Sequence, residues 1–373
     1  MNVATLRYAS GVWSAPFPNL DGEQTVVLAF GAPSYGEAPA ALAELAQAYP
    51  RAAIVGCSTA GEIDQTRIRD ESVTVAIARF ERTRIQKTQA ALTAAADSRR
   101  AGGEIAEQLA AAPNLRAVFV LSRGTDVNGS ELVRGLNEKL PPEVVVTGGL
   151  AGDGARFGKT WVMLDGATTG DAVVAVGLYG DAVRVTHGSQ GGWDTFGPER
   201  VVTSSKGNVL YELDDRPALA LYKEYLGERA AGLPGSALLF PLALRGSHGG
   251  LVRTVLGVDE ATQSMVFAGD IPTGSYAKLM RANFDRLILG AQAAGSAALS
   301  DHAGPTLCIA ISCVGRRLVL GERSEEEIEA TLEVLPKGTA QVGFYSYGEL
   351  SPHATGRCDL HNQTMTLTVV SEA

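Results

Sequence analysis

Apolar and polar positions follow a pattern that repeats along the chain. Residues 25–30 (TVVLAF) form a short apolar run typical of a buried strand, residues 38–49 (APAALAELAQAY) have the composition of a helix, and residues 52–56 (AAIVG) form the next apolar run. The same order of strand, helix and strand returns at 116–147 and at 306–345. We therefore predict a mixed α/β fold in which strand–helix–strand units recur within the chain.

Two pairs of strand-like segments accompany the first two units. Residues 72–80 (SVTVAIARF) and 84–90 (RIQKTQA) are separated by a short turn, and so are residues 171–180 (DAVVAVGLYG) and 182–188 (AVRVTHG). A short turn between two strands is typical of a β-hairpin. We predict two hairpins that complete mixed sheets flanked by helices.

The region from about residue 198 to residue 298 departs from this repeat. The stretch 201–208 (VVTSSKGN) consists of small and polar residues and marks the expected boundary. The sequence therefore divides into an N-terminal segment (1–24), a first domain (25–203) and a second domain (204–373).

Each repeated unit continues from its second strand into a glycine-rich turn that ends in an acid. Residues 56–62 (GCSTAGE) and 343–349 (GFYSYGE) align without a gap, and residues 148–153 (GGLAGD) align with one residue fewer. Because ligands in open α/β sheets bind beyond the carboxyl ends of strands, we expect the three turns to meet in one ligand site. The acids of that site are Glu62, Asp153 and Glu349. The alternative is that the glycines serve tight turns and the carboxylates cap nearby N–H groups.

Composition narrows the class of protein. The chain has 373 residues, 45% of them hydrophobic and 20% charged, which excludes disorder. A net charge of -9 argues against nucleic-acid binding, because that function needs a surface that neutralises phosphates. The sequence contains neither a signal peptide nor an apolar span, and four cysteines without metal or redox spacing fit a reducing compartment. We expect a soluble, cytoplasmic protein that does not bind membranes.

Three residues are candidates for a catalytic nucleophile or a haem ligand. Cys57 lies in the first turn, where a nucleophile would be exposed, but no histidine lies near it in sequence to act as its base. His187 and His361 have apolar and aromatic neighbours, which is the setting of a haem ligand; a structural histidine is the alternative. Residues 153–160 (DGARFGKT) resemble a phosphate-binding loop but are followed by a strand-like segment, which excludes that motif.

The turn motifs resemble the FIST sensory domain family in its N-terminal and C-terminal halves. The resemblance rests on 55–63 (VGCSTAGEI), 148–154 (GGLAGDG), 343–352 (GFYSYGELSP) and 361–368 (HNQTMTLT), and it covers the chain from about residue 25 to residue 372. It implies a ligand-sensing module of bacterial signal transduction, with small molecules such as amino acids as ligands. Residues 188–227 further resemble the NosP branch, which binds haem and senses nitric oxide.

The resemblance thus implies a stand-alone sensor that signals in trans to a histidine kinase or to a cyclic-di-GMP enzyme. Its sharpest form holds haem b through His187 or His361 and senses nitric oxide; the alternative form binds an amino-acid-like ligand and no cofactor. A homo-oligomer is left open. The predicted ligand-binding residues are Cys57, Ser58, Thr59, Glu62, Gly149, Asp153, Trp193, Tyr345, Tyr347, Glu349 and Asn362. Two other classes stay open: an enzyme that uses Cys57 or the acidic turns, and a scaffold without a ligand.

Overall fold

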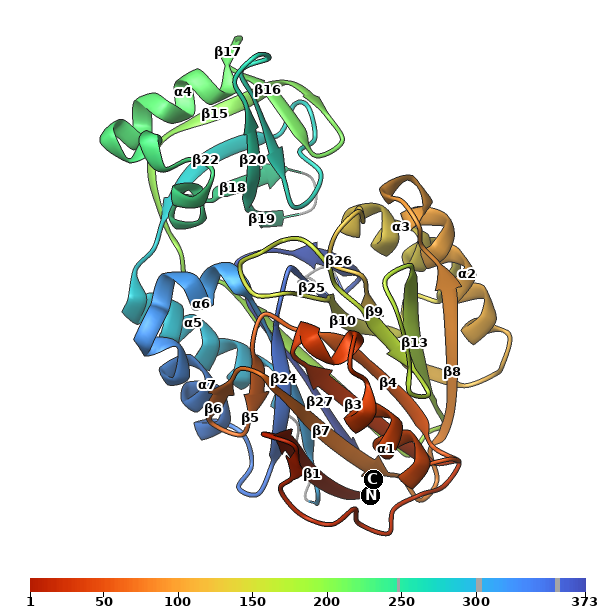
Figure 1. Ribbon diagram of the computed structural model, residues 1–373. Helices are drawn as coiled ribbons and strands as arrows, with labels where there is room; N and C mark the ends of the chain where they lie inside the picture. The colour runs from red at the N-terminus through yellow and green to blue at the C-terminus, as the bar shows by residue number, and fades with distance from the viewer. Residues whose placement is uncertain (247–248, 300–303, 353–355) are drawn as a thin grey trace.

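The computed structural model describes residues 1–246, 249–299, 304–352 and 356–373. It is a mixed α/β protein, 43% strand and 26% helical, with several mixed sheets flanked by helices, which confirms the predicted fold class. Both ends of the chain build one large body, and residues 194–281 form a smaller domain set upon it (Figure 1). Within the described ranges, no helix is long and apolar enough to cross a membrane.

Three repeated units build the body, and in each unit two strands pair in parallel. The first unit contains β3 (Thr25–Gly31), α1 (Ala40–Ala48) and β4 (Ala53–Ser58). The second contains β9 (Leu115–Ser122), α3 (Gly129–Lys139) and β10 (Val145–Leu150). The third contains β23 (Leu307–Cys313), α6 (Val314–Leu320), α7 (Ser324–Glu333) and β24 (Ala340–Ser346). The internal repeat predicted from the sequence is confirmed.

After its second strand, each unit sends a hairpin into the sheet of another unit. The first hairpin, β5 (Glu62–Asp64) with β6 (Arg67–Arg69), pairs with β24. The second, β11 (Val162–Leu164) with β12 (Ala167–Thr169), pairs with β4. The third, β25 (Gly348–Pro352) with β26 (Cys358–His361), pairs with β10. Because this exchange is cyclic, the three units cannot separate without breaking all three sheets.

The two hairpins predicted at 72–90 and 171–188 are wrong. β7 (Ser72–Arg79) lies between β3 and β1 (Asn2–Ala9), whereas β8 (Arg84–Ala91) pairs with β13 (Ala172–Tyr179) in another sheet. β13 in turn does not pair with β14 (Val183–Gln190), which lies beside β27 (Met365–Glu372). The physical reason is burial: β7 and β13 are buried almost throughout, so each occupies the centre of a sheet with strands on both sides.

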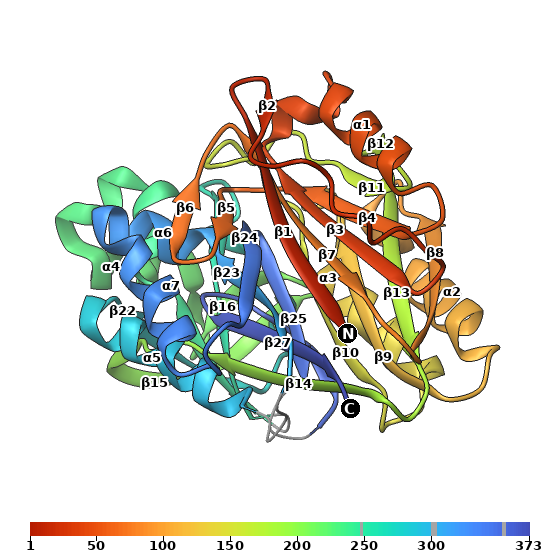
Figure 2. The ribbon, with the colours of Figure 1, turned by 90° about the horizontal axis from the view of Figure 1, so that it is seen from below.

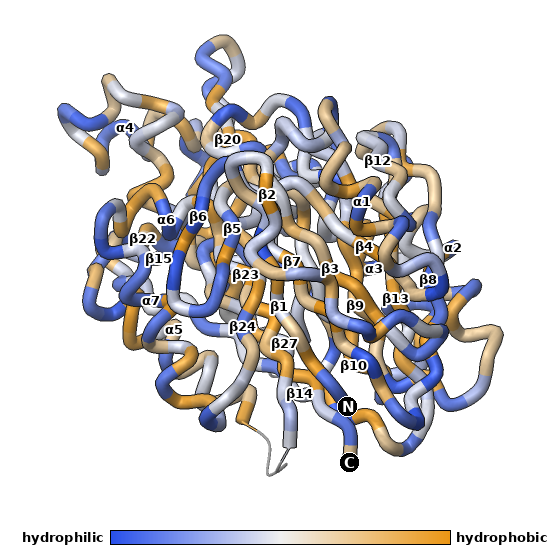
Figure 3. The backbone as a smooth tube through the Cα atoms, turned by 60° about the horizontal axis from the view of Figure 1, so that its bottom comes forward, coloured by the Kyte–Doolittle hydropathy of each residue, from blue (hydrophilic) through white to orange (hydrophobic). Residues whose placement is uncertain are grey.

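The core lies where the inner faces of the three sheets meet. Phe30, Phe119 and Phe344 come from three different sheets, and the ring centroids of Phe30 and Phe344 lie 4.8 Å apart. The helices lie on the outer faces (Figure 2), and the tube coloured by hydropathy shows apolar segments along the central strands (Figure 3). The body also contains β2 (Val12–Trp13), α2 (Ser98–Ala110), α5 (Phe284–Ala297) and three short 3-10 helices among its described residues.

In its described residues the smaller domain is an eight-stranded sheet with one α-helix. Its elements are β15 (Asp194–Lys206), β16 (Val209–Leu213), β17 (Arg216–Pro217), α4 (Ala218–Leu226), β18 (Leu242–Gly246), β19 (Gly249–Arg253), β20 (Val255–Asp259), β21 (Ser264–Phe267) and β22 (Tyr276–Arg281). The boundary expected between residues 203 and 204 falls inside β15, because the small polar residues there lead into the turn before β16, where Gly207 has a φ of 57°.

Candidate functional site

The three glycine-rich turns come together at the centre of the body. The N–H of Ala60 donates to Tyr345 O (2.8 Å), and the N–H of Tyr347 donates to Leu150 O (3.2 Å). The N–H of Gly152 donates to Ser58 O (2.9 Å) and closes the ring. The three turns therefore meet at the centre of the body.

Two of the predicted acids occupy equivalent positions in this ring. Thr59 and Ser72 both bond Glu62: the Thr59 hydroxyl donates to Oε1 (2.5 Å), and the Ser72 N–H and hydroxyl donate to Oε2 (3.1 and 2.7 Å). The same three bonds surround Glu349. The hydroxyl of Ser346 donates to its Oε1 (2.6 Å), and the N–H and hydroxyl of Thr364 donate to its Oε2 (3.3 and 2.9 Å). Burial raises the pKa of Glu62 to about 7 and the pKa of Glu349 to about 8.

The third predicted acid, Asp153, is not their equivalent, which corrects the alignment of the turns. By strand register, the position of Glu62 and Glu349 is taken in the second unit by Val162. The hydroxyl residues beside the two glutamates correspond there to Ala151 and Ala172. The second unit therefore has an apolar trio where the other two units have a hydrogen-bonded one.

Asp153 instead stabilises its own loop. Its carboxylate accepts the N–H of Gly158 (2.9 Å) and of Lys159 (2.8 Å), and it accepts the hydroxyl of Tyr347. Burial alone would raise the pKa of Asp153, but these hydrogen bonds outweigh burial and lower it. The three acids thus do not form one cluster, because the chain after Gly152 makes a longer loop before it returns to the sheet.

The other predicted residues lie mostly inside the protein. Tyr347 lines a cavity of about 60 Å³, and Asp153 lines a cleft of about 520 Å³. The indole N–H of Trp193 donates to Gln363 O (2.9 Å), and the buried Asn362 side-chain oxygen has no partner among the described residues. The remaining predicted residues are buried and line none of the four cavities described here; they are Cys57, Ser58, Thr59, Glu62, Gly149, Tyr345 and Glu349. Burial also raises the pKa of the Cys57 thiol well above its usual value, which opposes a role as nucleophile.

Neither candidate histidine fits a haem in this arrangement. His187 is half-buried on β14, and His361 is buried, with its Nε2 3.0 Å from Ser351 O. A haem needs an apolar slot beside its ligand, but neither histidine lines any of the four cavities described. The apolar cavity enclosed by the three sheets holds only about 30 Å³, far less than a haem requires. His248, His302 and His353 lie outside the described residues.

Three equivalent crevices surround the ring of turns, and in two of them a large side chain packs against a glycine. In one, Arg317 packs against Gly61, where a Cβ atom would collide with the guanidinium, and its Nη1 donates to Ala60 O (2.7 Å). In another, the indole of Trp161 packs against Gly36 in the same way. The register places Val127 and Gly348 at the corresponding positions of the third crevice.

The third crevice therefore lacks a large side chain at either position. The smaller domain covers it: the 60 Å³ cavity there is lined by Val127 and Leu150 of the body and by Asn208, Leu256 and Phe267 of the smaller domain. The smaller domain thus lies at the one of the three places that has no large side chain at these positions.

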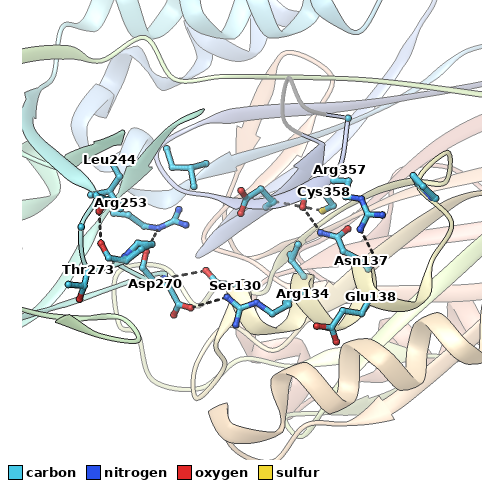
Figure 4. Close-up of a pocket in the computed structure, with 18 residues that line it drawn as sticks. Ser130, Arg134, Asn137, Glu138, Leu244, Arg253, Asp270, Thr273, Arg357 and Cys358 are labelled. Carbon is cyan, nitrogen blue, oxygen red and sulfur yellow. Dashed lines mark hydrogen bonds and ion pairs between the residues drawn. The ribbon is translucent and has the colours of Figure 1, made fainter. Parts of the chain in front are cut away.

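A larger cavity, of about 940 Å³, lies beside this crevice between α3, β26 and the smaller domain (Figure 4). Its volume lies in the range of small-molecule sites. It is lined by Ser130, Val133, Arg134, Asn137, Glu138, Pro142, Leu244, Leu251, Arg253, Asp270, Pro272, Thr273, Gly274, Ser275, Gly356, Arg357, Cys358 and Asp359. None of these residues was predicted from the sequence.

Arg253, the last residue of β19, places a buried positive charge in the wall of this cavity. Its side chain is only 3% exposed, and its guanidinium donates to three main-chain oxygens: from Nε to Asp270 O (3.1 Å), and from Nη1 to Leu360 O (2.9 Å) and Val252 O (3.3 Å). No carboxylate of the described residues lies within 4 Å of it. Burial lowers the pKa of Arg253, although the negative charges of Asp359 and Asp270 act in the opposite direction and raise it. A buried cation held only by carbonyls is incompletely neutralised and favours an anion beside it.

Both parts of the molecule position this group. Asn128 caps α3 by accepting the N–H of Glu131 (3.1 Å), and its amide donates to Asp270 Oδ1 of the smaller domain (3.0 Å). Gly269 leaves the space that Arg253 occupies, because a Cβ atom there would lie 2.9 Å from Arg253 Nε. A molecule in the cavity therefore contacts the body and the smaller domain together.

An arginine inside an apolar strand-like segment was the one available sequence signal for this site. Residues 251–258 (LVRTVLGV) are apolar except for Arg253 and Thr254. The guanidinium reaches Leu360, 107 positions away, and local pattern carries no information on that contact.

The molecule is thus a repeated α/β body with a cavity of small-molecule size beneath a second domain. The FIST N domain matches residues 25–216 and the FIST C domain matches residues 218–352. The chain belongs to the FIST family, as the turn motifs predicted, and FIST domains are associated with sensory signalling and the binding of small ligands.

The chain was also compared with solved structures and with curated proteins. The chain is similar to a solved structure, cyanuric acid hydrolase from A. caulinodans, at 12% identity over 78% of this chain and 99% of that one, with a TM-score of 0.20. A likeness at that level carries no argument about fold or activity. No curated protein matches the sequence.

Proposed function

We propose that this protein is a sensor that binds a small ligand of the amino-acid type in the 940 Å³ cavity, with the ligand carboxylate on Arg253. The observation that carries the proposal is the buried guanidinium of Arg253, which borders the cavity and has only carbonyl partners among the described residues. Charge-assisted hydrogen bonds from a guanidinium to a carboxylate are among the strongest available to a binding site.

The opposite charge in the cavity supports a ligand that also carries an ammonium group. Asp359 lines the cavity near Arg253 and accepts one hydrogen bond, from the N–H of Leu360 (2.8 Å). It forms no ion pair within the described residues, so one of its oxygens is available to an ammonium group. Leu244 and Leu251 provide apolar surface for an aliphatic chain.

The position of the cavity supports a sensory role. A ligand that contacts α3, β26 and β19 together stabilises one placement of the smaller domain on the body, and a ligand shifts an equilibrium by its differential affinity for the two states. We propose that this placement is the signal, and that a histidine kinase or a cyclic-di-GMP enzyme in the cytoplasm reads it in trans, in keeping with the association of FIST domains with sensory signalling.

Titration calorimetry with a panel of amino acids tests this function. We expect at least one amino acid to bind the wild-type protein and to raise its melting temperature, because a ligand of the native state stabilises it. Arg253→Gln removes the cation and should abolish that binding, while Arg253→Lys should keep part of it. Arg281→Gln is the matched control, because Arg281 is exposed in the same sheet and does not line the cavity. Equal binding by wild type and Arg253→Gln contradicts the proposal.

A further inference from the structure

The cavity contains a second guanidinium without a carboxylate partner, that of Arg357. Its Nη1 donates to Asn137 O (3.0 Å), and among the described residues no carboxylate lies within 4 Å of it. The third arginine of the cavity differs, because Arg134 is paired with Glu131 and has Asp270 at 3.9 Å. Figure 4 shows Arg253 and Arg357 on opposite sides of the cavity.

Arg357 is held in place by a reciprocal pair of hydrogen bonds. It donates to the main-chain oxygen of Asn137 in the last turn of α3, and the Asn137 side-chain amide donates back to Cys358 O (2.9 Å). The last carbonyls of a helix have no partner within the helix, so this bond satisfies a group that the fold leaves open. A guanidinium anchored at one edge presents its remaining N–H groups in a fixed direction, which reduces the entropy lost on binding an anion.

Three charged groups that line the cavity form no ion pair among the described residues. Glu138 is paired with Arg99, outside the cavity, and Asp270 lies beside Arg134 and Asn128. The groups without an ion pair are then two cations, Arg253 and Arg357, and one anion, Asp359. A ligand with two anionic groups and one cationic group would give each of these three groups a partner of opposite charge.

We infer that the ligand is an acidic amino acid, with one carboxylate on Arg253, the ammonium group toward Asp359 and the second carboxylate on Arg357. The inference rests on the proposed function and extends it from one anionic group to two. It assigns Arg357 as the residue that selects acidic over neutral ligands.

Pairs of ligands that differ only in the second acid test this assignment. We would titrate wild type, Arg357→Gln, Arg357→Lys and the Arg281→Gln control with L-glutamate against L-glutamine and with L-aspartate against L-asparagine, at low salt. In wild type and control, at least one acid should bind about fivefold more tightly than its amide. That ratio corresponds to the free energy of a strong exposed ion pair. Arg357→Gln should bring that ratio to about one without weakening the amide, and Arg357→Lys should keep part of the preference.

The outcomes separate this inference from the proposed function. Acids and amides that bind equally to wild type, with binding lost in Arg253→Gln, overturn the role of Arg357 and leave the proposed function standing. A preference for the acid that survives Arg357→Gln also overturns it. Failure of all four ligands to bind wild type overturns the acidic-amino-acid assignment, and the wider panel of amino acids then decides the proposed function separately.

Discussion

Arg253 and Leu360 join the two parts of the molecule: the guanidinium of Arg253, on the smaller domain, donates from Nη1 to the main-chain oxygen of Leu360 in β26 at 2.9 Å. The group that would bind an anion is therefore also a contact between the domains. A carboxylate on Arg253 would orient the side chain that holds this contact, so binding and domain placement share one residue.

The space left by Gly269 should be essential to this contact. We predict that Gly269→Ala weakens ligand binding at least tenfold and costs about 1–3 kcal/mol of stability, because the added Cβ atom collides with Arg253 Nε and with a methyl group of Leu360. Calorimetry and urea unfolding measure the two effects. Gly257→Ala in β20 is the control, since a Cβ atom there meets only Val266, at 4.0 Å. Unchanged binding by Gly269→Ala would show that the close packing around Arg253 is not needed.

The buried glutamates predict that the protein loses stability as the pH rises. The folded-state pKa of Glu349 is about 8 and that of Glu62 about 7, both above the ordinary glutamate value of 4.5, so the folded protein binds more protons than the unfolded chain between these limits. Their contribution is complete below about pH 4.5 and is lost as the pH rises through about 7 and 8. We expect a melting temperature several degrees lower at pH 9 than at pH 6. Glu349→Gln should flatten this dependence, and a wild-type profile that rises over the same range would contradict the assignment.

In the second unit, apolar residues replace the hydrogen-bonded trio of Thr59, Glu62 and Ser72. This replacement predicts the stability cost of substitutions in that trio. Glu62→Val alone leaves the hydroxyls of Thr59 and Ser72 without their acceptor and should cost about 1–3 kcal/mol. The triple variant Thr59→Ala, Glu62→Val, Ser72→Ala copies the residues of the second unit. Its cost in urea unfolding should be at least about 1 kcal/mol below the sum of the three single variants. Additive costs would mean that the three side chains do not act as a unit.

The positions of His187 and His361, away from the four cavities described, predict an optical result. Protein produced with ample haem should show no stoichiometric Soret band, because His187 and His361 line none of the four cavities described. A stoichiometric band that disappears in His187→Ala or His361→Ala would restore the haem-based nitric oxide sensor as the better account.

Local pattern predicted the repeat but not the pairing of its strands. The apolar run at residues 25–30 and the glycine-rich turn at 56–62 are set by neighbours in sequence, and both are found where expected. Strands β7 and β8 adjoin in sequence but belong to different sheets, since the exchange between units is decided by contacts between distant segments. Turn signals cannot distinguish a strand that folds back from one that crosses to another sheet.

The candidate site could not be predicted from the sequence for a related reason. The turns were recognised from their glycines, yet Glu62 and Glu349 are satisfied by hydroxyl groups 10 and 15 residues downstream and belong to the interior. The cavity instead depends on Arg253, Arg357 and Asp359, which come together only when the smaller domain lies on α3 and β26. Charge without a partner can be recognised only after every pairing in the fold is known.

A crystal structure of the protein soaked with L-glutamate tests the central claim most directly. The account predicts glutamate in the 940 Å³ cavity with one carboxylate within hydrogen-bond distance of the Arg253 guanidinium. Glutamate bound elsewhere, for example in the cleft beside Asp153, or an empty cavity at a saturating concentration, would contradict it.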